Sequence, residues 1–287
     1  MLNKGDKVAI CVCSDPLSPQ GVKDVYEIKR CFKSFGLEPV CSPILEETEP
    51  IINEHFFQQR AEILQNFFLA PDVKAIFDVS GGDLANTVID YLDFELIKAN
   101  AKPFFGYSDL TVLLNALYMQ TEQPMCLYTV RNLAREFGGI QRQRFKESIL
   151  EGKNTLFDFE YRFLRGIVVE GIVVGGNIRC FLKLAGTPNF PEMQDKILFL
   201  ESLGGEPYLL LSQLHQMKQI GIFKKIKGLV LGTFTNIEKN YSRKTVESIV
   251  LDVTAEYPFP VVSTAEIGHN PNAKALIIGQ LLFLYKN

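Results

Sequence analysis

The sequence contains no tryptophan and only three histidines among its 287 residues. The missing tryptophan excludes little, since 22 phenylalanines and 10 tyrosines can line a cleft equally well. The shortage of histidine is more informative, because imidazole titrates near neutral pH and is the commonest general base. Any chemistry that depends on histidine must use His55, His215 or His269.

An excess of charge of either sign is also missing. The chain has 30 basic and 33 acidic residues, a net charge of −3, whereas a nucleic-acid binder normally carries a clear basic excess. Its 47% hydrophobic and 22% charged residues exclude a disordered chain. At ~150 residues per domain, the length predicts one large or two ordinary globular domains.

Long hydrophobic runs are absent as well. Charged residues interrupt every apolar run well short of the ~20 residues that a membrane helix needs. The apolar stretch at residues 8–12 is shorter than the ~7–15 residues of a secretory signal and lacks its cleavage site. We therefore expect a first strand there, and a cytosolic protein that does not enter a membrane.

The six cysteines form no CxxC pair and lie scattered among apolar residues. A cytosolic chain of this size does not favour a disulfide framework, and a metal site needs clustered ligands. We predict buried free thiols and no metal. The cysteines are Cys11, Cys13, Cys31, Cys41, Cys126 and Cys180.

Short β-rich segments alternate with helical patterns through the first half. Strands are expected at residues 7–13, 37–41, 73–79 and 103–107, with helices at 22–35, 53–69 and 84–92 between them. This order favours a parallel sheet with helices on both faces, in which the loops after the strands gather into a ligand site. The fold class is thus α/β, with an N-terminal Rossmann-like domain over residues 1–155.

After about residue 150 strands become more frequent. Strands are expected at residues 157–164, 166–174, 196–200, 228–235, 260–263 and 275–285, and helices at 177–185, 207–220 and 245–256. We predict a smaller, β-rich α/β domain over residues 165–287.

Two motifs follow predicted strands of the first half. In Phe105-Gly-Tyr-Ser-Asp-Leu-Thr, Ser108 stands at a strand-to-helix turn, which suits an exposed nucleophile but also an ordinary helix N-cap. In Val79-Ser-Gly-Gly-Asp, the glycines Gly81 and Gly82 suit either a backbone oxyanion site or a tight turn with positive φ.

Two side chains of the second half could serve such a nucleophile. His269 lies in the loop Ile267-Gly-His-Asn-Pro-Asn, where it could be a general base or simply an exposed histidine. Glu201 ends an apolar strand, where a carboxylate can orient a histidine, whereas Glu206 is typical of a surface charge. His55 and His215 lie in helical patterns and are weaker candidates.

Taken together, these segments resemble the LD-carboxypeptidase family of serine peptidases, which includes the microcin C immunity peptidases. The resemblance covers essentially the whole chain. The segments that carry it are Leu2-Asn-Lys-Gly-Asp-Lys-Val-Ala-Ile, Arg60-Ala-Glu-Ile-Leu, Gly106-Tyr-Ser-Asp-Leu-Thr, Val174-Gly-Gly-Asn, Leu198-Phe-Leu-Glu-Ser and Ile267-Gly-His-Asn.

The resemblance implies a triad of Ser108, Glu201 and His269 in the cleft between the two domains. It also implies oxyanion donors at the backbone of Gly82 and Asp109. Members of the family are typically cytosolic homodimers without a cofactor. They cleave an amide next to a free carboxyl end, such as the terminal D-alanine of a murein tetrapeptide.

The chain departs from the murein-type pattern at two places and leaves alternatives open. Ser80-Gly-Gly-Asp-Leu replaces Arg-Gly-Gly-Tyr-Gly, and Thr129-Val130 replaces the usual Gly-Pro. The first change is closer to the microcin branch, which hydrolyses peptidyl or aminoacyl nucleotide analogues. Arg131 is a candidate for binding the substrate carboxylate, or else a solvated surface arginine, and Gly81 is a second candidate for substrate binding. A non-catalytic protein that binds a small ligand at the same loops is the competing class.

Overall fold

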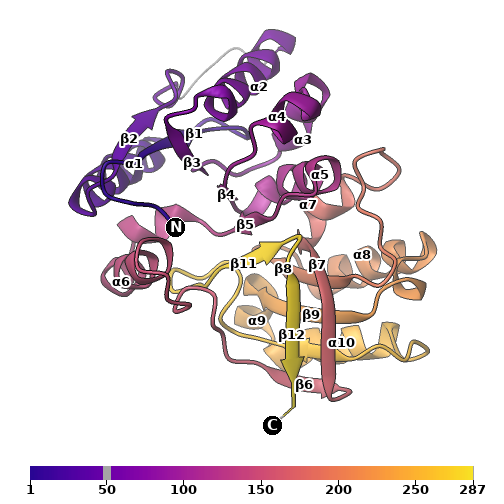
Figure 1. The fold of residues 1–287 in the computed structure, drawn as a ribbon. Helices are drawn as coiled ribbons and strands as arrows, with labels where there is room; N and C mark the ends of the chain where they lie inside the picture. The colour runs from indigo at the N-terminus through magenta and orange to yellow at the C-terminus, as the bar shows by residue number, and fades with distance from the viewer. Residues whose placement is uncertain (48–52, 287) are drawn as a thin grey trace.

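The computed structural model describes residues 1–47 and 53–286 of the chain. The two halves lie one above the other in Figure 1, and each is built on a six-stranded sheet. Both sheets are mostly parallel and flanked by helices, so the predicted α/β fold class is confirmed.

The first sheet has the strand order β11-β5-β4-β3-β1-β2. Its parallel strands are β1 (Lys7–Cys11), β2 (Glu38–Cys41), β3 (Val73–Asp78), β4 (Phe104–Gly106) and β5 (Met125–Leu127), and β11 (Leu276–Ile278) is antiparallel. The order 2-1-3-4-5 reverses direction between β1 and β3, and ligands bind outside the carboxyl ends of strands at such a switch point. The helices of this half are α1 (Pro19–Ser34), α2 (Glu54–Leu69), α3 (Ala85–Val88), α4 (Phe94–Ala99), α5 (Thr111–Thr121) and α6 (Gly138–Ile149).

The second sheet has the strand order β12-β7-β8-β9-β10-β6. Its parallel centre is β7 (Val168–Asn177), β8 (Ile197–Ser202), β9 (Gly228–Phe234) and β10 (Val261–Ser263), with β6 (Arg162–Arg165) and β12 (Leu281–Tyr285) antiparallel at its edges. The helices of this half are α7 (Ile178–Leu182), α8 (Pro207–Gln219), α9 (Thr235–Asn240) and α10 (Arg243–Val253).

The helix α1 begins three residues before the start that the hydrophobic pattern predicts. The Ser18 side chain accepts a hydrogen bond from the Gly21 amide, and Pro19 occupies the first helical turn, where its missing N–H costs nothing. Capping chemistry therefore fixed this end of the helix, whereas the apolar pattern only marked its buried face.

The prediction of a single closing strand over residues 275–285 is wrong. Gly279, with a φ of +85°, turns the chain between β11 and β12, and a Cβ there would lie 2.3 Å from the Tyr118 ring. As a result β11 pairs with β5 in the first sheet, while β12 pairs with β7 in the second. Apart from β11, the strands up to β5 belong to the first sheet and those from β6 onward belong to the second. The domain limits 1–155 and 165–287 stay a prediction.

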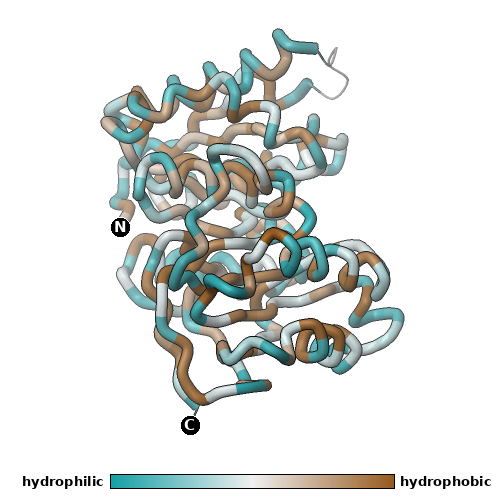
Figure 2. Tube along the Cα trace, turned by 90° about the vertical axis from the view of Figure 1, so that its right-hand side faces the viewer, coloured by the Kyte–Doolittle hydropathy of each residue, from teal (hydrophilic) through white to brown (hydrophobic). Residues whose placement is uncertain are grey.

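A shared hydrophobic core joins the two halves. Buried side chains of α5, among them Leu113 and Leu117, belong to the same cluster as Val173 and Phe199 of the second sheet. Hydrophobic and hydrophilic residues alternate at short intervals along the chain in Figure 2. Among the described residues, no helix is both long and apolar enough to cross a membrane.

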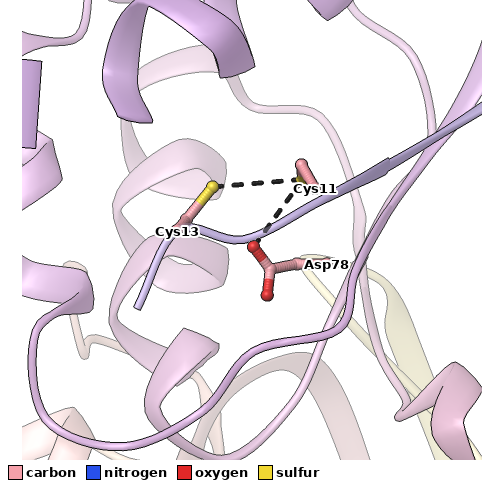
Figure 3. Close-up of side chains that lie close together, drawn as sticks. All are labelled: Cys11, Cys13 and Asp78. Atoms are coloured by element: carbon pink, nitrogen blue, oxygen red, sulfur yellow. Dashed lines mark hydrogen bonds between the residues drawn. The ribbon is translucent and has the colours of Figure 1, made fainter. Parts of the chain in front are cut away.

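The cysteines are free thiols, and all but the half-buried Cys41 are buried. Figure 3 shows a grouping that the sequence did not predict: Cys11 Sγ lies 4.0 Å from Cys13 Sγ and 3.6 Å from Asp78 Oδ2. The buried Arg60 guanidinium is electrostatically attracted to the Asp78 carboxylate, and its positive charge opposes a second cation here. We interpret the group as protonated thiols linked by hydrogen bonds.

These thiols are expected to resist alkylation in the folded protein. Burial raises the pKa of Cys11 to about 11, and the hydrogen bond to Cys11 together with burial raises the pKa of Cys13. The reactive thiolate is therefore scarce at pH 8, whereas Cys41 is accessible. Iodoacetamide labelling mapped by mass spectrometry should modify Cys41 first and the buried thiols only in denaturant. Fast labelling of native Cys11 or Cys13 would contradict this.

Candidate active site

Ser108 stands at a strained turn between β4 and α5. It begins a short 3₁₀ turn, η2 (Ser108–Leu110), and its φ of +57° lies in the left-handed region that residues other than glycine rarely occupy. A Cβ at Gly106 would lie 2.7 Å from the Leu110 side chain, so glycine is needed for the turn to close. Such strained strand-to-helix turns expose a nucleophile above the sheet.

His269 comes from the loop that follows β10 in the second half. Its Nε2 lies 3.0 Å from Ser108 Oγ, although the two residues are 161 positions apart in the sequence. The other two histidines, His55 and His215, are exposed on α2 and α8. The structure thus brings the loop histidine singled out in the sequence next to Ser108, and its role as a general base stays a prediction.

Gly268 is expected to be indispensable for the position of this loop. Its φ is +148°, and a Cβ there would lie 1.8 Å from Thr233 Oγ1. Gly268→Ala should therefore lower the free energy of unfolding by about 1–3 kcal/mol. The matched control is Gly204→Ala, where the added Cβ meets nothing within 4 Å. Chemical denaturation of the two variants checks this, and equal stability would contradict it.

Glu201 is completely buried at the end of β8 and completes a chain of hydrogen bonds. Its Oε2 lies 2.6 Å from His269 Nδ1, on the side of the ring that faces away from Ser108. The Tyr107 hydroxyl donates to Oε2 at 3.2 Å, and Asn177 Nδ2 donates to Oε1 at 3.0 Å. With each oxygen paired, the carboxylate is held in one orientation.

Tyr107 and Asn177 were not predicted as functional residues. Burial and the negative charge of Glu201 raise the pKa of Tyr107, so its hydroxyl remains a donor. Asn177 ends β7 directly beside Glu201 in the sheet register. Both residues stand in the quoted motifs Gly-Tyr-Ser and Val-Gly-Gly-Asn, so position in a motif was the signal that could have found them.

Hydrogen bonds between α5 and the end of β7 join the two halves close to Ser108. Asn115 donates to the Gly175 carbonyl at 2.8 Å and accepts from its amide at 2.9 Å. Thr111 Oγ1 accepts from the Asn177 amide at 3.0 Å, and a Cβ at Gly176 would lie 2.5 Å from that oxygen. Gly175 and Gly176 therefore permit close contact between α5, the helix that follows Ser108, and β7, the strand that carries Asn177.

The Asp109 side chain anchors the turn from below. It is fully buried and accepts hydrogen bonds from Ser14 Oγ at 2.7 Å, the Ala85 amide at 2.8 Å and Lys183 Nζ at 2.6 Å. Lys183 follows α7 of the second half, so this ion pair also ties the halves together. The backbone amide of Asp109, predicted as an oxyanion donor, is thereby fixed next to Ser108.

The glycine loop after β3 lies beside Ser108. Ser80 Oγ accepts from the amides of Cys13 and Ser14, which ties the loops after β1 and β3 together. Gly81 lines the pocket, and a Cβ there would lie 3.8 Å from that of Ser108. Gly82 has a φ of +130° and packs against the Asp15 carboxylate, and it is not among the lining residues. Its assignment as an oxyanion donor stays a prediction.

A cavity of about 440 Å³ opens over these side chains and takes its walls from both halves. Arg131 is one of its lining residues. Its Nε and one terminal nitrogen, Nη2, lie 3.1 and 3.0 Å from Asp24 Oδ2, and only 20% of its side chain is exposed. Arg131 is therefore a largely buried arginine paired with Asp24, and the alternative of a solvated surface arginine is wrong. The lining is Ser80, Gly81, Tyr107, Ser108, Thr129, Arg131, Asn132, Arg135, Leu203, Gly268, His269, Asn270 and Pro271.

Comparison with known families gives two matches that together span most of the chain. Residues 8–128 match the LD-carboxypeptidase N-terminal domain, and residues 170–284 match the LD-carboxypeptidase C-terminal domain. The chain belongs to the LD-carboxypeptidase family. The boundary between the two matches lies in the same region as the change from the first sheet to the second.

Curated relatives of this LD-carboxypeptidase family member include murein peptide carboxypeptidases and a microcin self-immunity protein. A probable murein peptide carboxypeptidase of Bacillus subtilis is 27% identical over 97% of this chain and 88% of its own length. The murein tetrapeptide carboxypeptidase of Pseudomonas aeruginosa is 24% identical over 80% of this chain and 78% of its own. The microcin C7 self-immunity protein MccF of Escherichia coli is 25% identical over 77% and 74%.

Solved structures of the family share the fold. MccF in complex with glutamyl sulfamoyl guanosine superimposes with a TM-score of 0.85 at 18% identity, covering 100% of this chain and 97% of that one. A muramoyltetrapeptide carboxypeptidase from Oxalobacter formigenes has a TM-score of 0.81 at 23% identity, covering 98% and 95%. At these identities the likeness establishes the two-domain α/β architecture.

Proposed function

We propose that the protein is a serine peptidase that hydrolyses an amide bond next to a free carboxyl end. The observation that carries this proposal is the unbroken chain of hydrogen bonds from Ser108 Oγ through the His269 ring to the buried Glu201 carboxylate. A protein that only binds a small ligand at these loops has no need for such a chain. The proposed roles are nucleophile for Ser108, general base for His269 and orienting carboxylate for Glu201.

In the proposed reaction Ser108 Oγ attacks the scissile carbonyl while His269 Nε2 takes its proton. Glu201 accepts a hydrogen bond from Nδ1–H, which selects the tautomer with a free Nε2 and stabilises the imidazolium. The imidazolium then protonates the leaving amine, and an acyl-enzyme ester remains on Ser108. Water, deprotonated by the same His269, releases the acyl group and restores the hydroxyl.

Backbone amides stabilise the oxyanion in this proposal. The Asp109 amide follows the nucleophile on the turn that its own buried carboxylate anchors, and the Gly82 amide belongs to the neighbouring glycine loop. Donors fixed before the reaction cost no reorganisation when charge develops, and one such donor contributes about 10²–10³-fold to kcat. No cofactor is needed in this scheme.

A murein-type substrate is the first choice, because a murein-named relative matches 97% of the chain and the MccF relative 77%. The second candidate is a microcin-type amide hydrolase, which the Ser80-Gly-Gly-Asp motif favours. The purified protein should release D-alanine from a murein tetrapeptide. Hydrolysis of an aminoacyl sulfamoyl adenosine alone would favour the second candidate, and cleavage of neither substrate would overturn the proposed function.

We further propose a cytoplasmic homodimer, as the family resemblance implies. The peptide or peptidyl-nucleotide substrate is its only expected partner, with no nucleic acid and no membrane. Light scattering coupled to size-exclusion chromatography measures the molar mass directly. A mass near twice 32.4 kDa is expected, and a mass of 32.4 kDa at all concentrations would contradict the dimer.

A further inference from the structure

The charged residues that line the cavity over Ser108 are all arginines. Arg131 and Arg135 are its only charged lining residues within the described chain, and no carboxylate lines it. Both belong to the segment after β5, at the 3₁₀ turn η3 (Val130–Ala134) and directly behind it. The cavity is therefore positive at one wall, although the protein as a whole has a net charge of −3.

One buried carboxylate, Asp24 of α1, balances these two cations incompletely. Its Oδ2 accepts from Nε and Nη2 of Arg131, and from Nε of Arg135 at 3.4 Å. Its Oδ1 accepts from Gln20 at 3.1 Å. Two guanidinium groups against one carboxylate leave a net charge of +1 beside the cavity.

The two arginines differ in how much of their hydrogen-bonding capacity is used. Arg131 is fixed by two contacts to Asp24 and has 20% of its side chain exposed. Arg135 makes one long contact through Nε and is 40% exposed. In the part of the chain that the structure describes, its two terminal nitrogens have no hydrogen-bond partner. The outer face of the guanidinium is thus available to a ligand.

The surroundings of Arg135 favour an incoming anion. Burial and the neighbouring positive charge of Arg131 lower the pKa of Arg135, which means that its cation is poorly compensated. A carboxylate relieves this repulsion and matches the planar donor fork of arginine with two parallel hydrogen bonds. A phosphate group matches the same pair of donors, but the group that the proposed reaction releases carries a carboxylate.

We propose that Arg135 binds the free carboxylate of the substrate and that Arg131, held by Asp24, is a positioning residue for it. The inference rests on the proposed function and deepens it, because it assigns the requirement for a free carboxyl end to one side chain. The cavity that Arg135 lines also exposes Ser108, so one peptide can reach both. A substrate whose carboxylate is replaced by a carboxamide loses this contact.

The test compares two substrates that differ only in that group, an acyl-D-alanine and the corresponding acyl-D-alaninamide. The wild type should prefer the acid by about 10- to 100-fold in kcat/KM, the range expected for a charge-assisted pair. Arg135→Gln should abolish that preference, chiefly through a higher KM for the acid. Arg135→Lys keeps the charge without the fork and should retain part of the preference.

Arg30→Gln is the matched control, since this arginine is exposed on α1 and, in the described part of the chain, forms an ion pair with Glu27 alone. It should keep the full preference. If Arg135→Gln also keeps it, the inference is overturned while the proposed function stands. If the wild type cleaves both substrates equally well, the inference and the proposed requirement for a free carboxyl end both fail, although amide hydrolysis remains. If the wild type cleaves neither substrate nor the murein tetrapeptide, the proposed function itself has failed.

Discussion

We expect Ser108→Ala to lower kcat by at least about 10⁴-fold and to leave the fold intact, as is typical for loss of a triad nucleophile. Alanine keeps the Cβ that Ser108 already places in the left-handed region, so no new backbone strain is introduced. Among the residues that the structure describes, the only hydrogen bond lost with the hydroxyl is the one to His269 Nε2. Turnover of the confirmed substrate and the thermal unfolding midpoint together measure both parts of this prediction.

A serine outside the cavity provides the comparison. Ser212 is exposed on α8, and Ser212→Ala should keep wild-type turnover. Substrate binding to Ser108→Ala should survive, because the walls of the cavity are untouched. Turnover of Ser108→Ala within tenfold of the wild type would remove Ser108 as the nucleophile and with it the proposed mechanism.

We expect Glu201→Gln to lower kcat by about 10⁴-fold through the tautomer of His269. The Glu201 carboxylate can only accept, so it holds the proton on His269 Nδ1 and leaves Nε2 free to take the Ser108 proton. A glutamine amide can instead donate to Nδ1, which moves the proton to Nε2. The ring then points correctly but cannot act as a base.

The nearby Glu206 gives a matched control for this substitution. Glu206 lies five residues further on, exposed before α8, and Glu206→Gln should be indistinguishable from the wild type in turnover. A crystal structure of Glu201→Gln should retain the His269 ring position, since Tyr107 and Asn177 still surround the side chain. Full activity of Glu201→Gln would show that His269 needs no carboxylate partner.

Local sequence patterns were sufficient for the fold class and for the three residues proposed as a triad. Alternation of strands and helices determines a parallel sheet, because consecutive parallel strands need a crossover between them. That sheet places Ser108 at a strand end, where parallel sheets carry their ligand sites. The chemistry of the side chains then limited the choice of partners for Ser108. A loop histidine, His269, and a carboxylate at a strand end, Glu201, were the best-placed candidates.

The partners of Glu201 and Asp109 could not be read from the sequence in the same way. Asn177 reaches Glu201 because β7 and β8 pair in a particular register, and Lys183 reaches Asp109 because α7 packs beside α5. Register and helix packing are set by many contacts between residues distant in sequence. No single segment carries them.

The sequence alone predicted an α/β protein of the LD-carboxypeptidase type and singled out Ser108, Glu201 and His269 as the proposed triad, because these predictions depend on short motifs and on how few histidines there are. Only the tertiary structure decided that the closing segment divides between the two sheets at Gly279, and that Arg135 joins Arg131 over a single carboxylate. Both features arise where distant parts of the chain meet. Charge balance and strand pairing at such places depend on residues that are neighbours in space but lie far apart in the sequence.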